Sequence, residues 1–172
     1  MIDISGQPKR GRPEAAGNVD RGRDTDAALY ERLAPELIRF ATTLVGPSDA
    51  EDLLGSAVLK AITTSGWADI ENKRAYLYRT IANVAHSARR SGARRRNREL
   101  RTHRRDEFEH AHVDPNLMRS LRTLSIRQRA VVHLTYWADL SPSQVAQMLD
   151  TSLRTVEREL TNARNRLEEE LS

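Results

Sequence analysis

The strongest constraint on the fold is a repeating apolar pattern near the carboxyl end, from Leu124 to Leu171. Its apolar residues recur at spacings of three and four, which places them on one face of a helix. A polar turn, Asp150-Thr151-Ser152, separates a short segment from a longer one. We expect Ser141 to cap the short segment, with Pro142 at its first helical position, and Ser152 to cap the long one. Short helix, tight turn and long helix together indicate a helix-turn-helix.

Three helices are therefore expected in this stretch, each with one buried face. The apolar residues that define these faces are, helix by helix, Ala130, Leu134 and Trp137; Val145, Ala146 and Leu149; and Leu153, Val156, Leu160, Ala163 and Leu167.

The opposite face of the last helix carries arginine, hydroxyl and amide groups at Arg154, Arg158, Thr161 and Asn165. Such side chains bind phosphates and base edges in a major groove. The competing interpretation is a three-helix bundle with a solvated face. Spacing and side-chain type together favour DNA binding.

Charge is unevenly distributed along the chain, whose net charge is +4. The segment 89–105 holds nine arginines and one glutamate, a charge of +8, so the rest of the chain carries 4 − 8 = −4. A basic belt in an otherwise acidic protein indicates a polyanionic partner.

The composition excludes several classes of function. Hydrophobic residues are 38% and charged residues 30% of the chain, which favours small helical units over one large core. No stretch is apolar enough for membrane insertion or a secretory signal, so a cytoplasmic protein is expected. Without cysteine, and without a phosphate-binding glycine loop or a metalloprotease motif, we expect neither an enzyme nor a cofactor.

Two segments lack apolar periodicity. Residues 1–25 are expected to be a disordered tail, in which Arg10-Gly11-Arg12-Pro13 is either an AT-hook-like minor-groove contact or, more simply, inert. Residues 97–115 are expected to be a linker. Its histidines have no standard ligand spacing, so no metal site is predicted at His103, His110 and His112.

The remaining chain, 26–96, reads as three helices. Pro35 is expected to kink or split the first, Gly46-Pro47 to end it, and Ser48 with Glu51 to form a capping box for the second. Ser65-Gly66 should end the second helix, before a loop over 67–72 and a third helix over 73–93. The predicted buried residues are Leu29, Leu33, Leu37, Ala41 and Leu44; Leu54, Ala57, Val58 and Ile62; and Leu77, Ile81, Val84 and Ala88.

Two surfaces of this unit have alternative interpretations. Acidic residues at the start of the second helix either complement the helix dipole or contact a basic partner. The outer face of the third helix mixes aromatic, amide and cationic groups, which suit either solvent or unpaired bases and their phosphates. The arginines downstream favour the second interpretation for this face, which consists of Tyr76, Arg79, Asn83, His86 and Arg90.

The two units together resemble the sigma-70 family of bacterial RNA polymerase sigma factors, and most closely its small extracytoplasmic-function (ECF) group. The carboxyl-terminal likeness lies in LSIRQR at 124–129 and in TV at 155–156, followed by Ala163-Arg164 and Leu167. The amino-terminal likeness lies in DAEDL at 49–53 and AYLYRTIAN at 75–83. The resemblance implies an all-α fold of two small domains, region 2 over 26–96 and region 4 over 116–172, joined by a flexible linker.

The resemblance also implies roles for particular residues. Contact with the clamp helices of the polymerase largest subunit would come from Asp49, Glu51, Asp52 and Leu53. Contact with the −10 promoter element would come from Trp67, Asp69, Asn72, Tyr76, Arg79, Asn83, His86 and Arg90. Contact with the −35 element would come from Ser152, Arg154, Thr155, Arg158, Thr161 and Arg164.

Further partners implied by the resemblance are the polymerase flap, promoter DNA as duplex and as melted strand, and an anti-sigma factor. The chain departs from the family pattern at Gly55-Ser56 and Val58, where a Gln-Glu pair and an aromatic are common, and at Glu157 in the DNA-facing helix. The function implied is promoter recognition and DNA melting with core polymerase. The alternatives are a stand-alone helix-turn-helix regulator, which would bind duplex DNA alone, and an adaptor with protein partners only.

Overall fold

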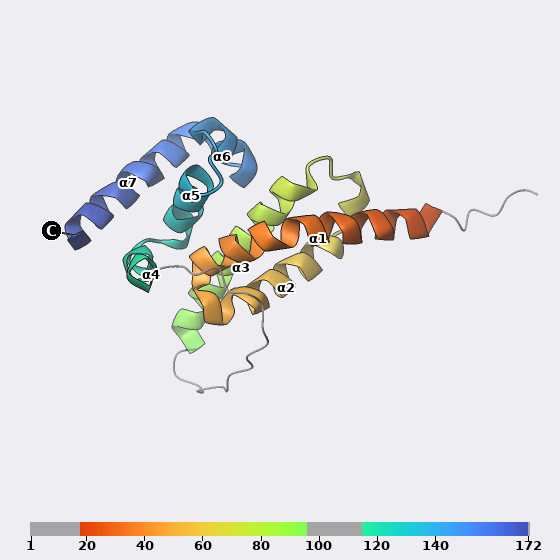
Figure 1. Cartoon of the computed structure of the whole chain (residues 1–172), viewed down its shortest axis with the longest axis horizontal. Helices are drawn as coiled ribbons and strands as arrows, with labels where there is room; N and C mark the ends of the chain where they lie inside the picture. The colour runs from red at the N-terminus through yellow and green to blue at the C-terminus, as the bar shows by residue number, and fades with distance from the viewer. Residues whose placement is uncertain (1–17, 96–114, 172) are drawn as a thin grey trace, which may run out of the picture. The chain divides into compact units, whose positions relative to one another are not determined.

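The computed structural model describes residues 18–95 and 115–171 (Figure 1). These residues form helices without any strand, which confirms the all-α prediction. The elements are α1 (Asn18–Val45), α2 (Pro47–Ile62), the short 3-10 helix η1 (Trp67–Asp69), α3 (Lys73–Arg95), α4 (Pro115–Thr123), α5 (Ile126–Tyr136), α6 (Pro142–Leu149) and α7 (Leu153–Leu171). The expectations for the tail and the linker concern mainly residues 1–17 and 96–114, which lie outside the described residues, as do Arg10–Pro13 and the three linker histidines.

The chain divides into two units, 1–32 and 33–172. The described part of the first unit is the amino-terminal half of α1. Since α1 begins at Asn18, helix replaces the last residues of the tail that was predicted to reach residue 25. Every contact below lies within the second unit.

The amino-terminal helices share one apolar core. Helix α2 packs on α3, and α1 contributes Leu37 and Phe40, which are both fully buried. The rings of Phe40 and Tyr78 lie 4.8 Å apart and join α1 to α3. Burial of each such side chain stabilises the fold by roughly 1.5–3 kcal/mol.

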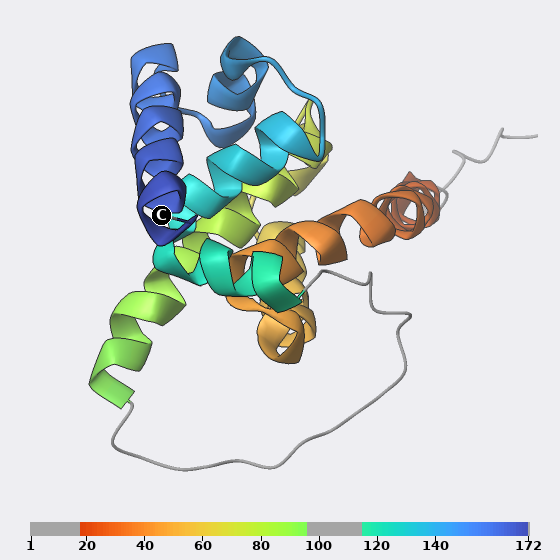
Figure 2. The ribbon, with the colours of Figure 1, turned by 60° about the vertical axis from the view of Figure 1, so that its left-hand side comes forward.

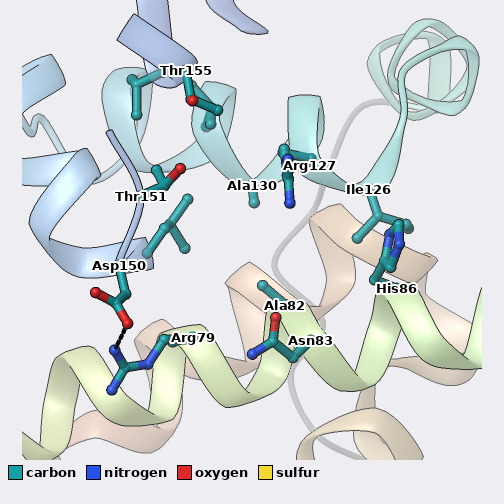
Figure 3. Close-up of a pocket in the computed structure, with 13 residues that line it drawn as sticks. Arg79, Ala82, Asn83, His86, Ile126, Arg127, Ala130, Asp150, Thr151 and Thr155 are labelled. Atoms are coloured by element: carbon teal, nitrogen blue, oxygen red, sulfur yellow. Dashed lines mark ion pairs between the residues drawn. The ribbon is translucent and has the colours of Figure 1, made fainter. Parts of the chain in front are cut away.

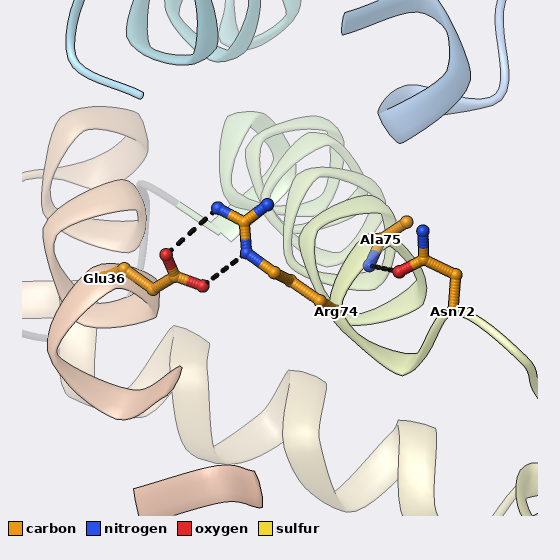
Figure 4. A network of polar contacts seen from close by, with 4 residues as sticks. All are labelled: Glu36, Asn72, Arg74 and Ala75. Carbon is orange, nitrogen blue, oxygen red and sulfur yellow. Dashed lines mark hydrogen bonds and ion pairs between the residues drawn. The ribbon is translucent and has the colours of Figure 1, made fainter. Parts of the chain in front are cut away.

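One ion pair fixes how α1 meets α3 (Figure 4). Arg74 donates from Nε to Glu36 Oε1 at 2.7 Å and from Nη2 to Oε2 at 3.0 Å. The Arg74 guanidinium also lies 5.2 Å from the centre of the Tyr78 ring. Burial, together with the Glu36 carboxylate, raises the pKa of Tyr78 to about 12, so this phenol stays neutral.

The start of α2 differs from the prediction. Pro35 lies inside α1, which is assigned as one helix, so the proline does not split it. The capping box at Ser48 is absent. Helix α2 begins at Pro47, whose missing N–H costs nothing at a first helical position, and Gly46 precedes it with φ 93°. Ser48 thus lies inside the helix.

Several predicted buried residues face outward instead. Ile62 is 48% exposed and Ala88 is also exposed, whereas Leu53, which was assigned to polymerase contact, is buried. Helix α2 packs on α3, and its buried residues are Ala50, Leu53, Leu54, Ala57 and Ala61, so the buried stripe is shifted from the predicted one. In the carboxyl-terminal helices Trp137 and Leu153 are likewise exposed, at 52% and 44%.

The carboxyl-terminal helices enclose a second core (Figure 2). Helix α7 contacts α4, α5 and α6, and Figure 2 shows α7 beside α5. Helix α4 was not predicted as a separate helix. It completes this core with Met118 and Leu121, which pack with Leu124, Val132 and Ala163. The exposed Arg166 on α7 donates from Nη1 to the carbonyl of Thr123 at 3.0 Å, which fastens α7 to the end of α4.

Candidate nucleic-acid interface

Helices α6 and α7 form the predicted helix-turn-helix, and side chains fix its two ends. Ser141 caps α6 by accepting from Gln144 N, and the Gln144 side chain accepts from Ser141 N in return. Asp150 ends α6 in the left-handed conformation, with φ 52°. Ser152 Oγ then accepts from Thr155 N at 3.1 Å, which caps α7. The predicted caps at Ser141 and Ser152 are confirmed.

The residues predicted to contact the −35 element form an exposed row along α7. Thr155 is partly buried, while Ser152, Arg154, Arg158, Thr161 and Arg164 are exposed. Arg158 has only a loose ion pair, 3.6 Å from Glu159, and its side chain is 62% exposed. The row therefore offers three guanidinium groups and two hydroxyls on the face turned away from the core.

The outer face of α3 presents the second predicted set. Asn83, His86 and Arg90 are exposed, whereas Tyr76 and Arg79 are half-buried. The Arg79 guanidinium lies 5.4 Å from the centre of the Tyr76 ring, and the Trp67 ring meets the same tyrosine edge-on at 6.1 Å. Cationic and aromatic groups thus lie together near the start of α3.

The loop before α3 is anchored by residues that were assigned to DNA contact. Trp67 is only 9% exposed, and Lys73 Nζ lies 5.0 Å from the centre of its ring. Asn72 Oδ1 accepts from Ala75 N at 2.9 Å and so caps α3 (Figure 4). Both side chains therefore stabilise the loop conformation. Asp69, which was also assigned to the −10 element, is exposed and accessible to a partner.

The acidic start of α2 is exposed at Asp49, Glu51 and Asp52. Leu53 does not belong to this surface, because it packs into the core with 7% exposure. The three carboxylates therefore form the accessible part of the predicted polymerase contact.

The predicted −10 face of α3 contacts the turn between α6 and α7 (Figure 3). Arg79 Nη1 lies 2.8 Å from Asp150 Oδ2, so an arginine of α3 is paired with the turn of the helix-turn-helix. Beside this pair is a cavity of about 260 Å³, lined from α3 by Arg79, Asn83 and His86 and from the opposite side by Thr151 and Thr155. Helix α3 also packs on α5 and α6.

A buried histidine forms a further contact between the amino-terminal and carboxyl-terminal helices. His133 of α5 is 6% exposed, and its Nδ1 lies 2.8 Å from Thr43 Oγ1 of α1. The Thr43 hydroxyl gives its one proton to the Arg39 carbonyl, so His133 donates from Nδ1. Burial is the main cause that lowers the pKa of His133 to about 4; the nearby Arg39 charge adds to this effect, and the Glu36 carboxylate opposes it.

Arg129 is a buried cation held by carbonyl groups. Its guanidinium donates from Nε to Leu124 O, from Nη2 to Arg122 O and from Nη1 to Leu44 O. The last acceptor belongs to the final turn of α1, where free carbonyls and the helix dipole favour a positive charge. Burial lowers the pKa of Arg129, and the Arg89 and Arg122 charges add to this effect.

Sequence reasoning missed Arg129, His133 and Asp150. Arg129 and His133 are four residues apart and lie among the apolar residues of α5. Polar residues at the helical spacing of an apolar face indicate buried hydrogen bonds. Asp150 was assigned to a turn, and no local signal indicated its partner on α3.

Within the described residues, no group of acidic or histidine side chains is placed to hold a metal ion. Among the helices that the structure describes, none is both long and apolar enough to cross a bilayer.

Both helical units match known family models. Residues 29–95 match sigma-70 region 2, and residues 115–167 match sigma-70, region 4. Hereafter these ranges are called region 2 and region 4.

Similar proteins of known identity carry the same designation. The chain is 36% identical over 145 residues to the RNA polymerase sigma-E factor of Streptomyces coelicolor, covering 78% of this chain and 79% of that one. It is 35% identical to the sigma-E factor of Streptomyces avermitilis, with 78% of each chain covered. The fold is similar to that of the sigma factor RpoE in its complex with the anti-sigma factor NepR from Bartonella quintana, with a TM-score of 0.65 and 23% identity over 86% of this chain and 97% of that one. The chain thus belongs to the sigma-70 family of RNA polymerase sigma factors, in its extracytoplasmic-function group, and directs transcription initiation by core polymerase.

Proposed function

We propose that three surfaces divide the work of promoter recognition. The exposed row of α7 binds the −35 duplex, the outer face of α3 holds the unpaired −10 strand, and the acidic start of α2 contacts the polymerase. The observation that carries this proposal is the exposed row at Arg154, Arg158, Thr161 and Arg164, which lies on the second helix of a capped helix-turn-helix.

The α7 row suits a major groove. A recognition helix places the residues of its amino-terminal half against base edges, and these four residues extend from the first turn to the middle of α7. Arginine donates two parallel hydrogen bonds to guanine, while other arginines and hydroxyls bind phosphates. Glu157, also exposed on α7, is suited to accept a hydrogen bond from the amino group of cytosine.

The α3 face suits single-stranded DNA. Stacking of unpaired bases on aromatic rings contributes about 1–3 kcal/mol per base, and arginines bind the phosphates. Removing a base from the duplex costs a few kcal/mol, which such contacts offset. Tyr76 is the aromatic group that this face offers, and the buried Trp67 supports it from below.

The polymerase contact is assigned to Asp49, Glu51 and Asp52, which would face the basic clamp helices of the largest subunit, while region 4 would face the flap. The polymerase supplies all bond-forming chemistry, so this chain needs no catalytic residue, and it acts in the cytoplasm with the polymerase. An anti-sigma factor is the expected antagonist, by analogy with the complex from Bartonella quintana.

Run-off transcription with purified bacterial core polymerase tests the proposal. A library of promoter fragments is transcribed with the wild-type protein and with Asp49→Arg/Asp52→Arg, which reverses two exposed charges. The matched control is Glu169→Arg/Glu170→Arg, which reverses two exposed charges at the far end of α7.

We expect specific start sites with the wild type and the control, and none with the α2 variant. Equal transcription with both variants would remove the polymerase contact from α2. Transcription that fails in every case, together with tight duplex binding by the protein alone, would instead support the stand-alone regulator.

A further inference from the structure

Leu153, the first residue of α7, faces solvent although its spacing predicted that it would be buried. Its side chain is 44% exposed, whereas Val156 and Ala163 further along the same apolar stripe are buried. The stripe therefore extends past the core of region 4 at the amino-terminal end of α7. There it leaves a large apolar side chain on the surface, at the end of the helix proposed to enter the major groove.

Hydrogen bonds on both sides of Leu153 fix the start of α7. Ser152 Oγ accepts from Thr155 N at 3.1 Å, and the Ser152 carbonyl accepts from Val156 N at 3.1 Å. The hydroxyls of Ser152 and Thr155 also lie 2.8 Å apart and bind each other. The backbone that carries Leu153 is thus ordered before DNA binds, which lowers the entropy cost of binding.

Two adjacent lines of side chains run along the outer side of α7. Residues four apart lie on one line of a helix, one turn above each other. The first line is cationic and contains Arg154 and Arg158. The second line contains Leu153, Glu157 and Thr161, which are all exposed.

The second line is unsuited to phosphate groups. Leucine has no donor, and the Glu157 carboxylate is negatively charged and only accepts hydrogen bonds. Thr161 Oγ1 donates its proton to the Glu157 carbonyl at 3.0 Å. The neighbouring Arg158 pairs with Glu159 instead of Glu157. In a major groove these side chains can therefore meet base edges but cannot follow the DNA backbone.

The chemistry of the base edges selects a partner for each residue. In the major groove only thymine presents a methyl group, and cytosine presents an amino donor. Contact between Leu153 and a thymine methyl group removes both from water. The Glu157 carboxylate accepts a hydrogen bond from the cytosine amino group, whereas guanine presents two acceptors there and repels it.

The spacing of the two residues limits the spacing of the two bases. Leu153 and Glu157 are one turn apart, or about 6 Å along the helix axis. Successive bases of a DNA strand are about 3.4 Å apart. The two base pairs that these residues contact are therefore at most about two steps apart.

We infer that Leu153 and Glu157 set the base preference of the −35 contact, Leu153 for a thymine and Glu157 for a cytosine within two base pairs of it. The inference rests on the proposed binding of the −35 duplex by α7. The cationic line beside these residues supplies the attraction to DNA that a leucine and a carboxylate cannot.

Transcription from a −35 library tests the Leu153 assignment. Promoters randomised at the −35 element are transcribed by core polymerase with each protein variant, and the transcribed promoters are sequenced. The wild type should favour thymine at one position and cytosine within two positions of it. Leu153→Ala should lose the thymine preference, while Leu153→Met, which keeps a long apolar side chain, should retain it. Leu59→Ala on α2 is the control, because Leu59 is also exposed, at 61%, and should leave both preferences unchanged.

The same library tests the Glu157 assignment. Glu157→Gln keeps the length of the side chain and adds a donor, and glutamine pairs with adenine through one donor and one acceptor. The preferred base should therefore change from cytosine to adenine at that position. Glu169→Gln, near the far end of α7, should keep the cytosine preference. A cytosine preference that persists in Glu157→Gln would contradict the assignment.

A change in the DNA alone gives a second test of Leu153. Uracil differs from thymine only by the missing methyl group, so the preferred thymine is replaced by deoxyuridine in a single promoter. At limiting holoenzyme, wild-type transcription should fall about fourfold, the effect of leaving one buried apolar carbon in water. Leu153→Ala should transcribe both promoters equally. Equal transcription of both promoters by the wild type would overturn the inference.

These outcomes separate the inference from the proposed function. Base preferences at the −35 element that are the same in the wild type, Leu153→Ala and Glu157→Gln would overturn the inference and leave α7 as the reader of that element. No −35 preference in the wild type would overturn both. Alanine and glutamine are good helix formers at these exposed positions, and circular dichroism confirms that each variant is folded.

Discussion

Thr43 Oγ1 and His133 Nδ1 lie 2.8 Å apart although 90 positions separate them in the chain, and this hydrogen bond is buried. It joins α1 in region 2 to α5 in region 4. The His133 ring is also enclosed by aromatic groups, edge-on to Phe40 at 5.2 Å and stacked on Trp137 at 5.8 Å. The neutral imidazole fits this site, and a second ring proton would have no acceptor among these rings.

Acid should therefore destabilise the protein through His133. Its pKa is about 4 in the folded protein, against an ordinary value of 6.5. The unfolded chain takes up the proton first, so stability is complete above pH 6.5 and falls as the pH drops from 6.5 to 4. The loss at pH 5 is about 2 kcal/mol. Urea unfolding of the wild type at pH 7 and pH 5 measures it.

A comparison of variants isolates this contribution from that of the carboxylates. His133→Gln should unfold with a smaller difference between the two pH values, while the exposed His86→Gln should keep the difference of the wild type. An unchanged difference in His133→Gln would show that another group is responsible.

Arg129→Met should destabilise the protein more than its exposed neighbour Arg127→Met. Methionine fills similar space but leaves three carbonyls, at Leu124, Arg122 and Leu44, without their donor. Hydrogen bonds to charged groups contribute about 1.5–3 kcal/mol each, and water replaces some of them, so we expect a net loss of about 2–4 kcal/mol. Urea unfolding at pH 7 measures this loss. Equal midpoints for the two variants would argue that the Arg129 bonds contribute nothing.

Ser141→Ala should loosen the helix-turn-helix. The substitution removes the acceptor for Gln144 N at the start of α6 and costs about 1 kcal/mol. Ser120→Ala is the control, because the hydroxyl of the partly buried Ser120 donates to the Asn116 carbonyl of its own helix and alanine favours a helix interior. Thermal unfolding compares the two. A larger loss in Ser120→Ala would show that the cap is unimportant.

If Arg158 reads a base, Arg158→Ala should lower the binding free energy for a matched promoter by about 1–3 kcal/mol. Transcription from that promoter should fall, and the sequence preference at one −35 position should relax. Run-off transcription across a −35 library measures both effects. A uniform loss on every promoter sequence would identify Arg158 as a phosphate contact instead. Arg119→Ala, on the exposed side of α4, is expected to change neither.

The sequence by itself determined the helices of both regions except α4, the caps at Ser141 and Ser152, and the outward row on α7. These features depend on residues a few positions apart, whose periodicity and capping chemistry are visible locally. Even so, local patterns gave a wrong phase for α2, because the apolar spacing could not reveal that Leu53 faces the core and Ile62 does not.

Only the tertiary structure decided which polar groups meet. The pairs Arg79–Asp150, Thr43–His133 and Arg129–Leu44 each join residues from different regions, and no local pattern encodes such a partner. The same holds for Trp67, which the family resemblance assigned to the −10 element and whose contacts with Lys73 and Tyr76 no local pattern indicated. The physical reason is that helix formation depends on neighbours along the chain, whereas burial and pairing depend on which helices pack together.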